Sequence, residues 1–265
     1  RFAESYVDQR YVGRPTMRQI SDESQRILSH FLAERGAEEI SSNTRIRSHF
    51  VATRLRRDRG RDRGLAFRVQ LAAAALHNAF SRRALGRLFE RILFRPAQTE
   101  IRYDDFRTVE CNLEARSVAL ALLAGGSIPL VMEGVRGTPG VPGVLFDGGI
   151  VDYHFDFEFQ RRPGLVLFPH FLDRIVPGWF DKPLKWRRPR LAALDDVVML
   201  APSDTFVASL PGGKLPNRND FLEFDTGERI RRWKNVIERC RVLADEFNDL
   251  SEGTRLAEAA LPFPG

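Results

Sequence analysis

Short apolar runs that alternate with helical segments are the feature that most constrains the fold of this chain. The run 144–146 leads directly into Asp-Gly-Gly at 147–149, and the runs 164–169 and 196–202 each end at a proline. Runs of this length are typical of buried strands, and strands separated by helices favour an α/β fold. We therefore predict a layered α/β protein with a largely parallel central sheet flanked by helices.

Five segments have the composition or the apolar periodicity of helices. They are residues 21–36, 65–80, 85–93, 114–124 and 225–248. The alternating stretch 44–53 predicts one more strand, and the arginine-rich stretch 54–64 predicts a charged loop. We divide the chain into an α/β domain over residues 1–225 and a helical extension over residues 226–265.

The charge of the chain favours anionic partners. Lys and Arg number 41 against 35 Asp and Glu, so the formal net charge is +6, and all but four of the cations are arginines. Such a surface attracts anions, phospholipid headgroups included. The stretch 54–63 is the best support for nucleic-acid binding, but Asp58 and Asp62 cancel part of its charge and no aromatic residue is interleaved. We expect no nucleic-acid partner.

Cysteine content and hydropathy limit the class of protein further. Two cysteines, Cys111 and Cys240, cannot build a disulfide scaffold, and we expect both to be buried and unreactive. The longest apolar stretch, 118–132, contains glycine and proline and is shorter than the roughly 20 residues that span a bilayer. We expect a cytoplasmic or peripheral membrane location. The chain opens on Arg1 without a signal core, which suggests that it starts inside a longer polypeptide.

Familiar motifs of catalysis and cofactor binding are missing from the 265 residues. The chain has no HExxH or CxxC pattern, no GxGxxG or GxxxxGK[ST] loop and no GxSxG elbow. We therefore expect neither a metal site nor a cofactor. Ser127 follows the end of a helix and is interpreted as a turn residue rather than a nucleophile. His154 is interpreted as a satisfied histidine beside a strand end rather than a ligand or a base.

The most suggestive motif is Asp147-Gly148-Gly149. A carboxylate directly after a buried strand lies at the edge of a sheet where open α/β folds bind their ligands. Two glycines permit positive φ angles and let another backbone or a substrate approach closely. By itself, however, Asp-Gly-Gly is also an ordinary turn signature.

The surrounding order of residues adds a family resemblance. Residues 118–154 contain an apolar helix, Gly-Gly, Ser-Ile-Pro, a short strand and then Asp-Gly-Gly. This order resembles the carboxy-terminal half of the patatin-like phospholipases. The strand 48–53 resembles the middle strand of the family, and the segment 169–188 resembles a segment of bacterial members. The resemblance covers about residues 1–225 and is specific over residues 118–154.

The resemblance implies a lipid acyl hydrolase with a Ser-Asp dyad. Asp147 would be its acid/base, and Gly148 and Gly149 would form the active-site loop. The substrate would be a phospholipid or another acyl ester, and no cofactor is implied. In that family the GxSxG serine, the Gly-rich oxyanion loop and the first strands precede the matched part. We expect a truncated sequence with these elements upstream. The alternative is a pseudoenzyme that binds a membrane or a nucleic acid without catalysis.

The stretch 177–190 interleaves aromatic and cationic side chains. Its candidate lipid-interface residues are Trp179, Phe180, Lys182, Lys185, Trp186, Arg187 and Arg188. Aromatic rings at the headgroup level beside cations suit contact with an anionic membrane. The alternative is a proline-rigidified surface loop whose tryptophans pack inward. The oligomeric state is left open.

Overall fold

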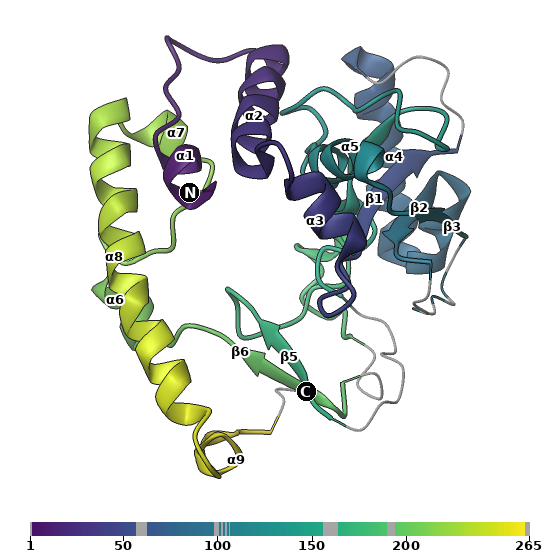
Figure 1. Ribbon diagram of the computed structural model, residues 1–265. Coiled ribbons are helices and arrows are strands. Elements are labelled where there is room, and N and C mark those ends of the chain that lie inside the picture. Colours follow the sequence, from purple (N-terminus) through teal and green to yellow (C-terminus); the bar gives the residue numbers. More distant parts are fainter. Residues whose placement is uncertain are drawn as a thin grey trace. The chain divides into compact units, whose positions relative to one another are not determined.

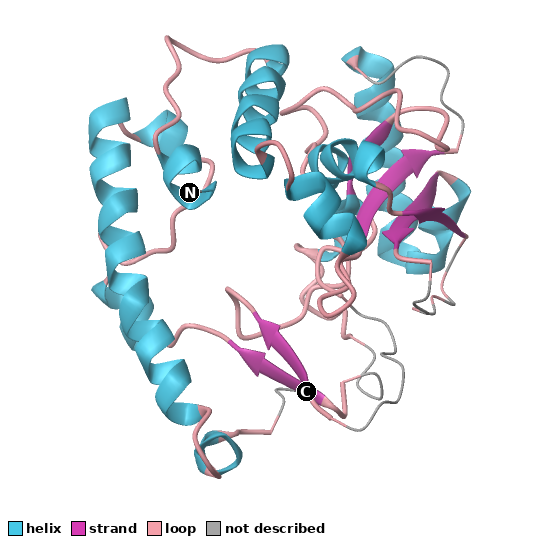
Figure 2. Cartoon of the chain, viewed as in Figure 1, coloured by secondary structure: helices cyan, strands magenta, loops and turns pink. Residues whose placement is uncertain are grey.

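The computed structural model describes residues 2–56, 63–97, 101, 103, 105, 107–155, 164–189 and 194–262. The chain, drawn in Figures 1 and 2, folds into two compact bodies. The first body comprises residues 16–162 and 175–194, and the second comprises residues 1–15, 163–174 and 195–265. The predicted boundary after residue 225 lies inside the second body, and the division into domains at that point stays a prediction.

The first body is built around a four-stranded sheet. Its elements are α2 (Met17–Leu32), α3 (Gly36–Ser42), β1 (Phe50–Leu55), α4 (Gly64–Phe80), η1 (Arg82–Arg87), β2 (Phe89–Arg95), β3 (Thr108–Asn112), α5 (Ala115–Gly125), β4 (Leu145–Asp147), η2 (Gly148–Ile150) and η3 (Trp179–Asp181). The strand order is β3-β2-β1-β4. The protein is therefore of the mixed α/β class, as predicted.

The prediction of a largely parallel central sheet is wrong for this sheet. β1 runs antiparallel to both β2 and β4, and only β2 and β3 are parallel. The apolar pattern of a strand buried on both faces is the same whichever way its neighbours run. The direction of a strand depends on how the connection before it returns to the sheet. The apolar runs do not indicate how these connections return.

Helices cover both faces of the sheet, which gives three layers (Figure 1). Leu145 of β4 packs in the cluster that includes residues of α2 and α5. The next residue, Phe146, points to the other face and stacks on Phe67 of α4 with ring centroids 5.1 Å apart. Successive side chains of this short strand point to opposite faces of the sheet, so β4 contacts both helical layers.

Sequence periodicity predicted some helices correctly and others wrongly. The helices predicted at 65–80 and 114–124 are confirmed as α4 and α5. The helix predicted at 85–93 is wrong, because this stretch forms the end of η1 and most of β2. Six of the seven residues of β2 are buried, so apolar side chains on both of its faces imitate a helical stripe.

The first long helix also differs from its predicted limits. α2 begins one turn before Ser21, at a capping box in which Thr16 and Gln19 bond to each other's backbone N–H groups. It ends at Leu32, and Gly36 starts α3 instead of stopping α2. Ser21 lies within the helix, where its hydroxyl accepts a hydrogen bond from the Glu133 N–H at 2.9 Å.

The second body is mainly helical. Its elements are α1 (Phe2–Val7), β5 (Val166–Pro169), β6 (Val197–Leu200), α6 (Asp204–Ser209), α7 (Asp220–Glu223), α8 (Thr226–Leu250) and α9 (Arg255–Ala259). β5 and β6 pair in parallel, but neither strand is fully buried as the sequence suggested. The long terminal helix is confirmed as α8, which is capped by Asp225.

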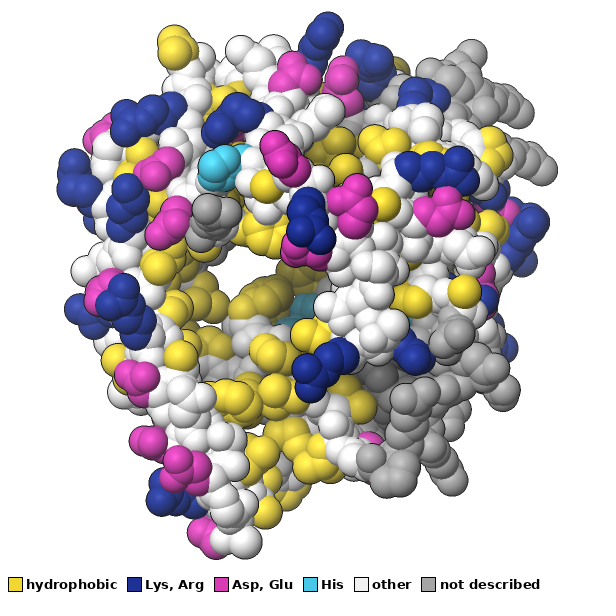
Figure 3. All heavy atoms as spheres, in the orientation of Figure 1, with side chains coloured by type: hydrophobic (Ala, Val, Ile, Leu, Met, Phe, Trp, Pro, Cys, Tyr) yellow, Lys and Arg dark blue, Asp and Glu magenta, His cyan; other side chains and the backbone are white. Residues whose placement is uncertain are grey.

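A small buried cluster holds α8 in the second body. Trp233 stacks on Tyr6 of α1 at 5.9 Å, and its indole N–H donates to Asp220 at 2.8 Å. The buried guanidinium of Arg229 donates to the carbonyl oxygens of Val7 and Gln9. Figure 3 shows mixed cationic and acidic side chains along the outer side of α8, in keeping with its ion pairs one turn apart.

The cysteine and membrane predictions have different outcomes. Cys111 is half-buried, whereas Cys240 is exposed on α8, so the prediction of two buried thiols is wrong for Cys240. Desolvation by neighbouring groups raises the pKa of both thiols, which favours the unreactive protonated form. Within the described residues, no helix combines the length and the apolar character that a membrane crossing requires.

Candidate active site

Asp147 is the last residue of β4 and lies opposite Ala52 of β1. Its own N–H donates to the carbonyl oxygen of Ser127 at 3.0 Å, so the residue is held from both sides of the strand. The Ser127 hydroxyl in turn donates to the carbonyl oxygen of Leu123 in the last turn of α5, at 2.7 Å. Ser127 is a buried turn residue, as the sequence predicted, and it supports the backbone of Asp147.

Close approach of the Val51 backbone requires glycine at position 148, and neighbouring side chains leave little room for a side chain at position 149. A Cβ atom on Gly148 would lie 2.3 Å from the carbonyl oxygen of Val51 in β1. A Cβ atom on Gly149 would lie 3.0 Å from Oδ1 of Asp147 and 3.3 Å from the ring of Tyr153. Neither glycine has a positive φ angle, so the expected use of that conformation is wrong here. What these positions need is space.

The carboxylate of Asp147 is engaged on one side. Oδ1 accepts a hydrogen bond from the Gly149 N–H at 2.7 Å, and no other residue in the described part of the chain donates to this carboxylate. Desolvation by burial raises the pKa of Asp147, and the Gly149 hydrogen bond and the charge of Lys182 partly offset that rise. The result is a carboxylate whose pKa lies above its ordinary value, with Oδ2 left for a further donor.

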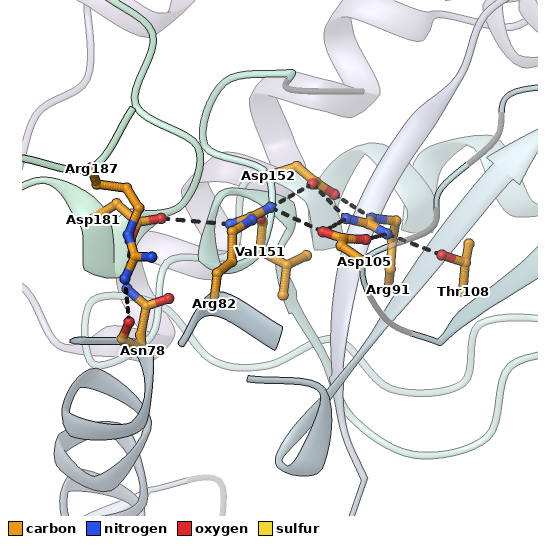
Figure 4. Close-up of polar contacts among 9 residues, drawn as sticks. All are labelled: Asn78, Arg82, Arg91, Asp105, Thr108, Val151, Asp152, Asp181 and Arg187. Carbon is orange, nitrogen blue, oxygen red and sulfur yellow. Dashed lines mark hydrogen bonds and ion pairs between the residues drawn. The ribbon is translucent and has the colours of Figure 1, made fainter. Parts of the chain in front are cut away.

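A buried ion network anchors the loop that follows Asp147 (Figure 4). The Arg91 guanidinium on β2 makes a bidentate pair with Asp152, Nε to Oδ2 at 2.6 Å and Nη2 to Oδ1 at 2.8 Å. It also donates to Asp105 at 2.9 Å and to Thr108 at 3.1 Å. Burial by itself would lower the pKa of Arg91, but the two carboxylates outweigh it and raise that pKa.

A second branch of the network reaches the segment around η3. Arg82 donates to the carbonyl oxygen of Val151 and lies 3.3 Å from Asp152. On its other side it lies 3.6 Å from Asp181, whose side chain is fully buried. Asp181 also accepts from Asn78 of α4 at 2.6 Å and pairs with Arg187 at 3.3 Å. The network thus ties β2, α4, the 147–152 loop and the 179–187 segment together.

The charges of this network balance. Three guanidinium groups, those of Arg82, Arg91 and Arg187, meet the carboxylates of three aspartates, Asp105, Asp152 and Asp181. A buried charge is tolerated when it is paired and hydrogen-bonded. Each of these groups has an ion-pair partner and at least one hydrogen bond, while Asp181 Oδ2 and Arg187 Nε are held by ion pairs without a hydrogen bond. The N–H of Asp152 also donates to the carbonyl oxygen of Gly148 at 2.8 Å. The network therefore restrains the backbone directly after Asp147.

The candidate lipid-interface residues fall into two groups. Trp179 and Phe180 are half-buried and pack against the cluster beneath α4. The alternative in which the tryptophans pack inward therefore holds for Trp179 but not for Trp186, which is 68% exposed. Arg187 is half-buried and committed to Asp181 and to the carbonyl oxygen of Asn78. The other four residues are exposed: Lys182, Lys185, Trp186 and Arg188. Lys182 lies 3.7 Å over the ring of Tyr153, beside the Asp147 loop.

His154 lies just beyond this loop and is buried. Its Nδ1 accepts a hydrogen bond from the Val176 N–H at 2.7 Å, and its backbone N–H donates to the Val176 carbonyl oxygen at 3.1 Å. The interpretation of a satisfied histidine is therefore confirmed for Nδ1 and not for the buried Nε2. Over the described residues, no three His, Cys, Asp or Glu side chains gather in an arrangement suited to a metal ion. Most of the arginine-rich stretch 54–63 lies outside the described residues.

Sequence reasoning did not predict the buried network: it assigned no role to Arg82 or Arg91, and it placed Arg187 at a lipid interface. Arg91 lies in a stretch that the periodicity predicts as helical. Arg82 is one of many arginines in the chain, and the sequence analysis places their charge at the surface. The partners are 61 and 70 residues away at Asp152, so no local spacing indicated them. The one available signal was a charged residue inside an otherwise apolar strand, since a buried charge needs a partner.

Comparison of the whole chain with protein-family models, with curated proteins and with solved structures finds no match.

Proposed function

We propose that the protein is a lipid acyl hydrolase of the patatin-like type, in which Asp147 is the acid/base of a Ser-Asp dyad. The observation that carries the proposal is the state of the Asp147 carboxylate. It ends a buried strand, one oxygen is oriented by Gly149, and burial raises its pKa. A general base works best when its pKa approaches the working pH, and the direction of this shift is the required one.

In the proposed reaction Asp147 moves one proton at each stage. Oδ2 accepts the serine hydroxyl proton as the serine oxygen attacks the ester carbonyl, and the proton then passes to the leaving alcohol. Asp147 next takes a proton from a water molecule, which attacks the acyl-enzyme. The fatty acid leaves, and the serine oxygen is reprotonated. Lys182 favours the ionised carboxylate, since its charge lowers the pKa of Asp147.

The nucleophile sets a condition on this proposal. Residues 1–265 contain no GxSxG motif, so the dyad needs a serine that these residues do not supply in that form. The order of α5, Ser127 and β4 before Asp147 supports the patatin-like assignment of the fold. A peripheral location at an anionic membrane is part of the same proposal, and the exposed Lys182, Lys185 and Arg188 support it.

Fluorophosphonate labelling of the full-length gene product tests the proposal. We expect one labelled serine, located by peptide mass spectrometry, and hydrolysis of a short-chain ester that Asp147→Asn lowers by about a hundredfold to ten-thousandfold. Asp204→Asn is the matched control, because Asp204 is an exposed aspartate on α6. Normal hydrolysis by folded Asp147→Asn would reject the dyad. Absence of labelling and hydrolysis in the folded wild type would favour the non-catalytic alternative.

A further inference from the structure

Helix α4 is apolar on two opposite faces. Its buried face, formed by Phe67, Leu71, Ala74 and Asn78, packs under the sheet. The opposite face carries Leu65, Val69, Leu76 and Phe80, and at 3.6 residues per turn these four positions lie in one stripe with Ala72 between them. Arg68, Gln70 and His77 lie between these two faces, so α4 is apolar on two sides and polar between them. Among the described residues of the first body, only the face of Phe67 and Leu71 is covered.

The exposure of this stripe is large. Leu65 is 78% exposed, Val69 59%, Leu76 62% and Phe80 84%. Single exposed apolar residues are common on protein surfaces, but a stripe that follows four turns of one helix forms a continuous patch. Such patches mark contact with an apolar partner or with a membrane. We call these four side chains the α4 stripe.

Exposed arginines lie close to the α4 stripe in the sequence. Residues 63–89 contain five arginines and no aspartate or glutamate, although Arg63 at the start of α4 pairs with Glu133 at 3.4 Å. Three of the five are exposed: Arg68 of α4, and Arg83 and Arg87 of η1. An apolar helix face with such cations beside it is complementary to anionic lipid, whose headgroups meet the cations while the acyl region receives the apolar side chains.

A tryptophan and two further cations lie on the segment that contacts the carboxyl end of α4. Arg187 donates to the carbonyl oxygen of Asn78 at 2.6 Å, which fixes this segment to the last turns of the helix. Its neighbours Lys185, Trp186 and Arg188 are exposed. Tryptophan beside cations is typical of the headgroup level of a membrane.

We propose that the α4 stripe is a membrane-docking surface that inserts into the interface of a bilayer containing anionic phospholipid. The proposal deepens the proposed function, on which the choice of a lipid surface partly rests. It assigns the apolar contact with the membrane to α4. Trp179 and Phe180, which the sequence suggested for this contact, pack inward. The exposed cations near the helix supply the attraction to headgroups, and the α4 stripe supplies the apolar contact that retains the protein.

The test is co-sedimentation of the full-length gene product with sucrose-loaded vesicles. One set contains phosphatidylcholine alone, and the other contains phosphatidylcholine and phosphatidylserine in equal amounts. We expect stronger binding to the second set and partial release by salt, which screens exposed charges. The double variant Leu76→Asp/Phe80→Asp should lower the partition coefficient at least about tenfold, because it removes two apolar contacts and adds two anions.

Ile46→Asp is the matched control for the single variant Phe80→Asp. Ile46 is 72% exposed in the loop between α3 and β1, so Ile46→Asp replaces one exposed apolar side chain by one negative charge away from the α4 stripe, as Phe80→Asp does within it. The vesicle binding of Ile46→Asp should fall far less than that of Phe80→Asp. Circular dichroism should show that all variants remain folded, since every changed side chain is exposed. Equal losses in Ile46→Asp and Phe80→Asp would overturn the assignment to α4.

Two more outcomes separate this proposal from others. Vesicle binding needs no turnover, so Asp147→Asn should bind vesicles like the wild type even if it hydrolyses nothing. Vesicle binding through the α4 stripe in a protein without hydrolase activity would uphold the docking surface and reject the proposed function. The docking proposal would be overturned if the wild type bound no vesicles and was a dimer while the double variant was a monomer. That result would show that a second copy of the chain covers α4.

Discussion

Arg91 and Asp152 form a bidentate pair in which both side chains are almost completely buried, with exposed fractions of 1% and 3%. Asp152 lies five residues after Asp147, and its N–H bonds to the carbonyl oxygen of Gly148. The pair therefore connects β2 to the loop that orients the candidate catalytic carboxylate. Removing either partner leaves the other as a buried charge with fewer partners, and that situation is costly.

We predict that Asp152→Asn destabilises the first body by about 3–5 kcal/mol, because Arg91 loses its bidentate partner in a buried setting. Urea unfolding followed by tryptophan fluorescence measures the change. Glu238→Gln is the control, since Glu238 pairs with Arg241 on the exposed side of α8 and contributes less than about 1 kcal/mol. A loss no larger in Asp152→Asn than in this control would contradict the role given to the network.

Gly148→Ala is expected to destabilise the protein by about 1–3 kcal/mol, because its Cβ would lie 2.3 Å from the carbonyl oxygen of Val51 and would push β1 and β4 apart. Thermal unfolding gives the measurement. The matched substitution is Gly126→Ala, whose Cβ would have its nearest neighbour at 3.9 Å. If both variants melted together, close approach would not be the reason for glycine at 148.

The raised pKa of Asp147 makes a prediction about stability and pH. An acid whose pKa is higher in the folded state costs stability once it ionises, so this cost is absent below its ordinary value of 3.8 and complete above the folded pKa. Asp147→Asn should therefore be more stable than the wild type at neutral pH, and the advantage should shrink toward acidic pH. Urea titrations at a series of pH values measure it. A constant difference across that range would contradict the shift.

Lys182→Gln should move the ionisation of Asp147 to higher pH, because the charge of Lys182 lowers the pKa of this carboxyl. Carbon NMR of the Asp147 carboxyl reports the shift without any need for turnover. In a hydrolase assay the acidic limb of the pH profile should move in the same direction. Lys185→Gln is the control, since Lys185 is equally exposed and is not among the groups that shift Asp147. Equal titration curves for the two variants would remove Lys182 from the site.

Local features of the site and of several helices could be predicted from the sequence. The apolar run 144–146 followed by Asp-Gly-Gly placed Asp147 at the end of a strand, and the structure agrees. The helices α4, α5 and α8 followed from composition and periodicity. These features depend on residues close together in the chain, where spacing and residue type carry the information.

Tertiary structure decided what depends on distant partners. It determined that β1 runs antiparallel to both neighbours, that residues 89–95 form a strand, and that three arginines are committed to three aspartates inside the first body. It also left the α4 stripe exposed, although the apolar side chains of α4 lie on two opposite faces of the helix. Each outcome depends on which surfaces meet across tens of residues, because a side chain's burial and charge partners are set by packing rather than by its neighbours in sequence.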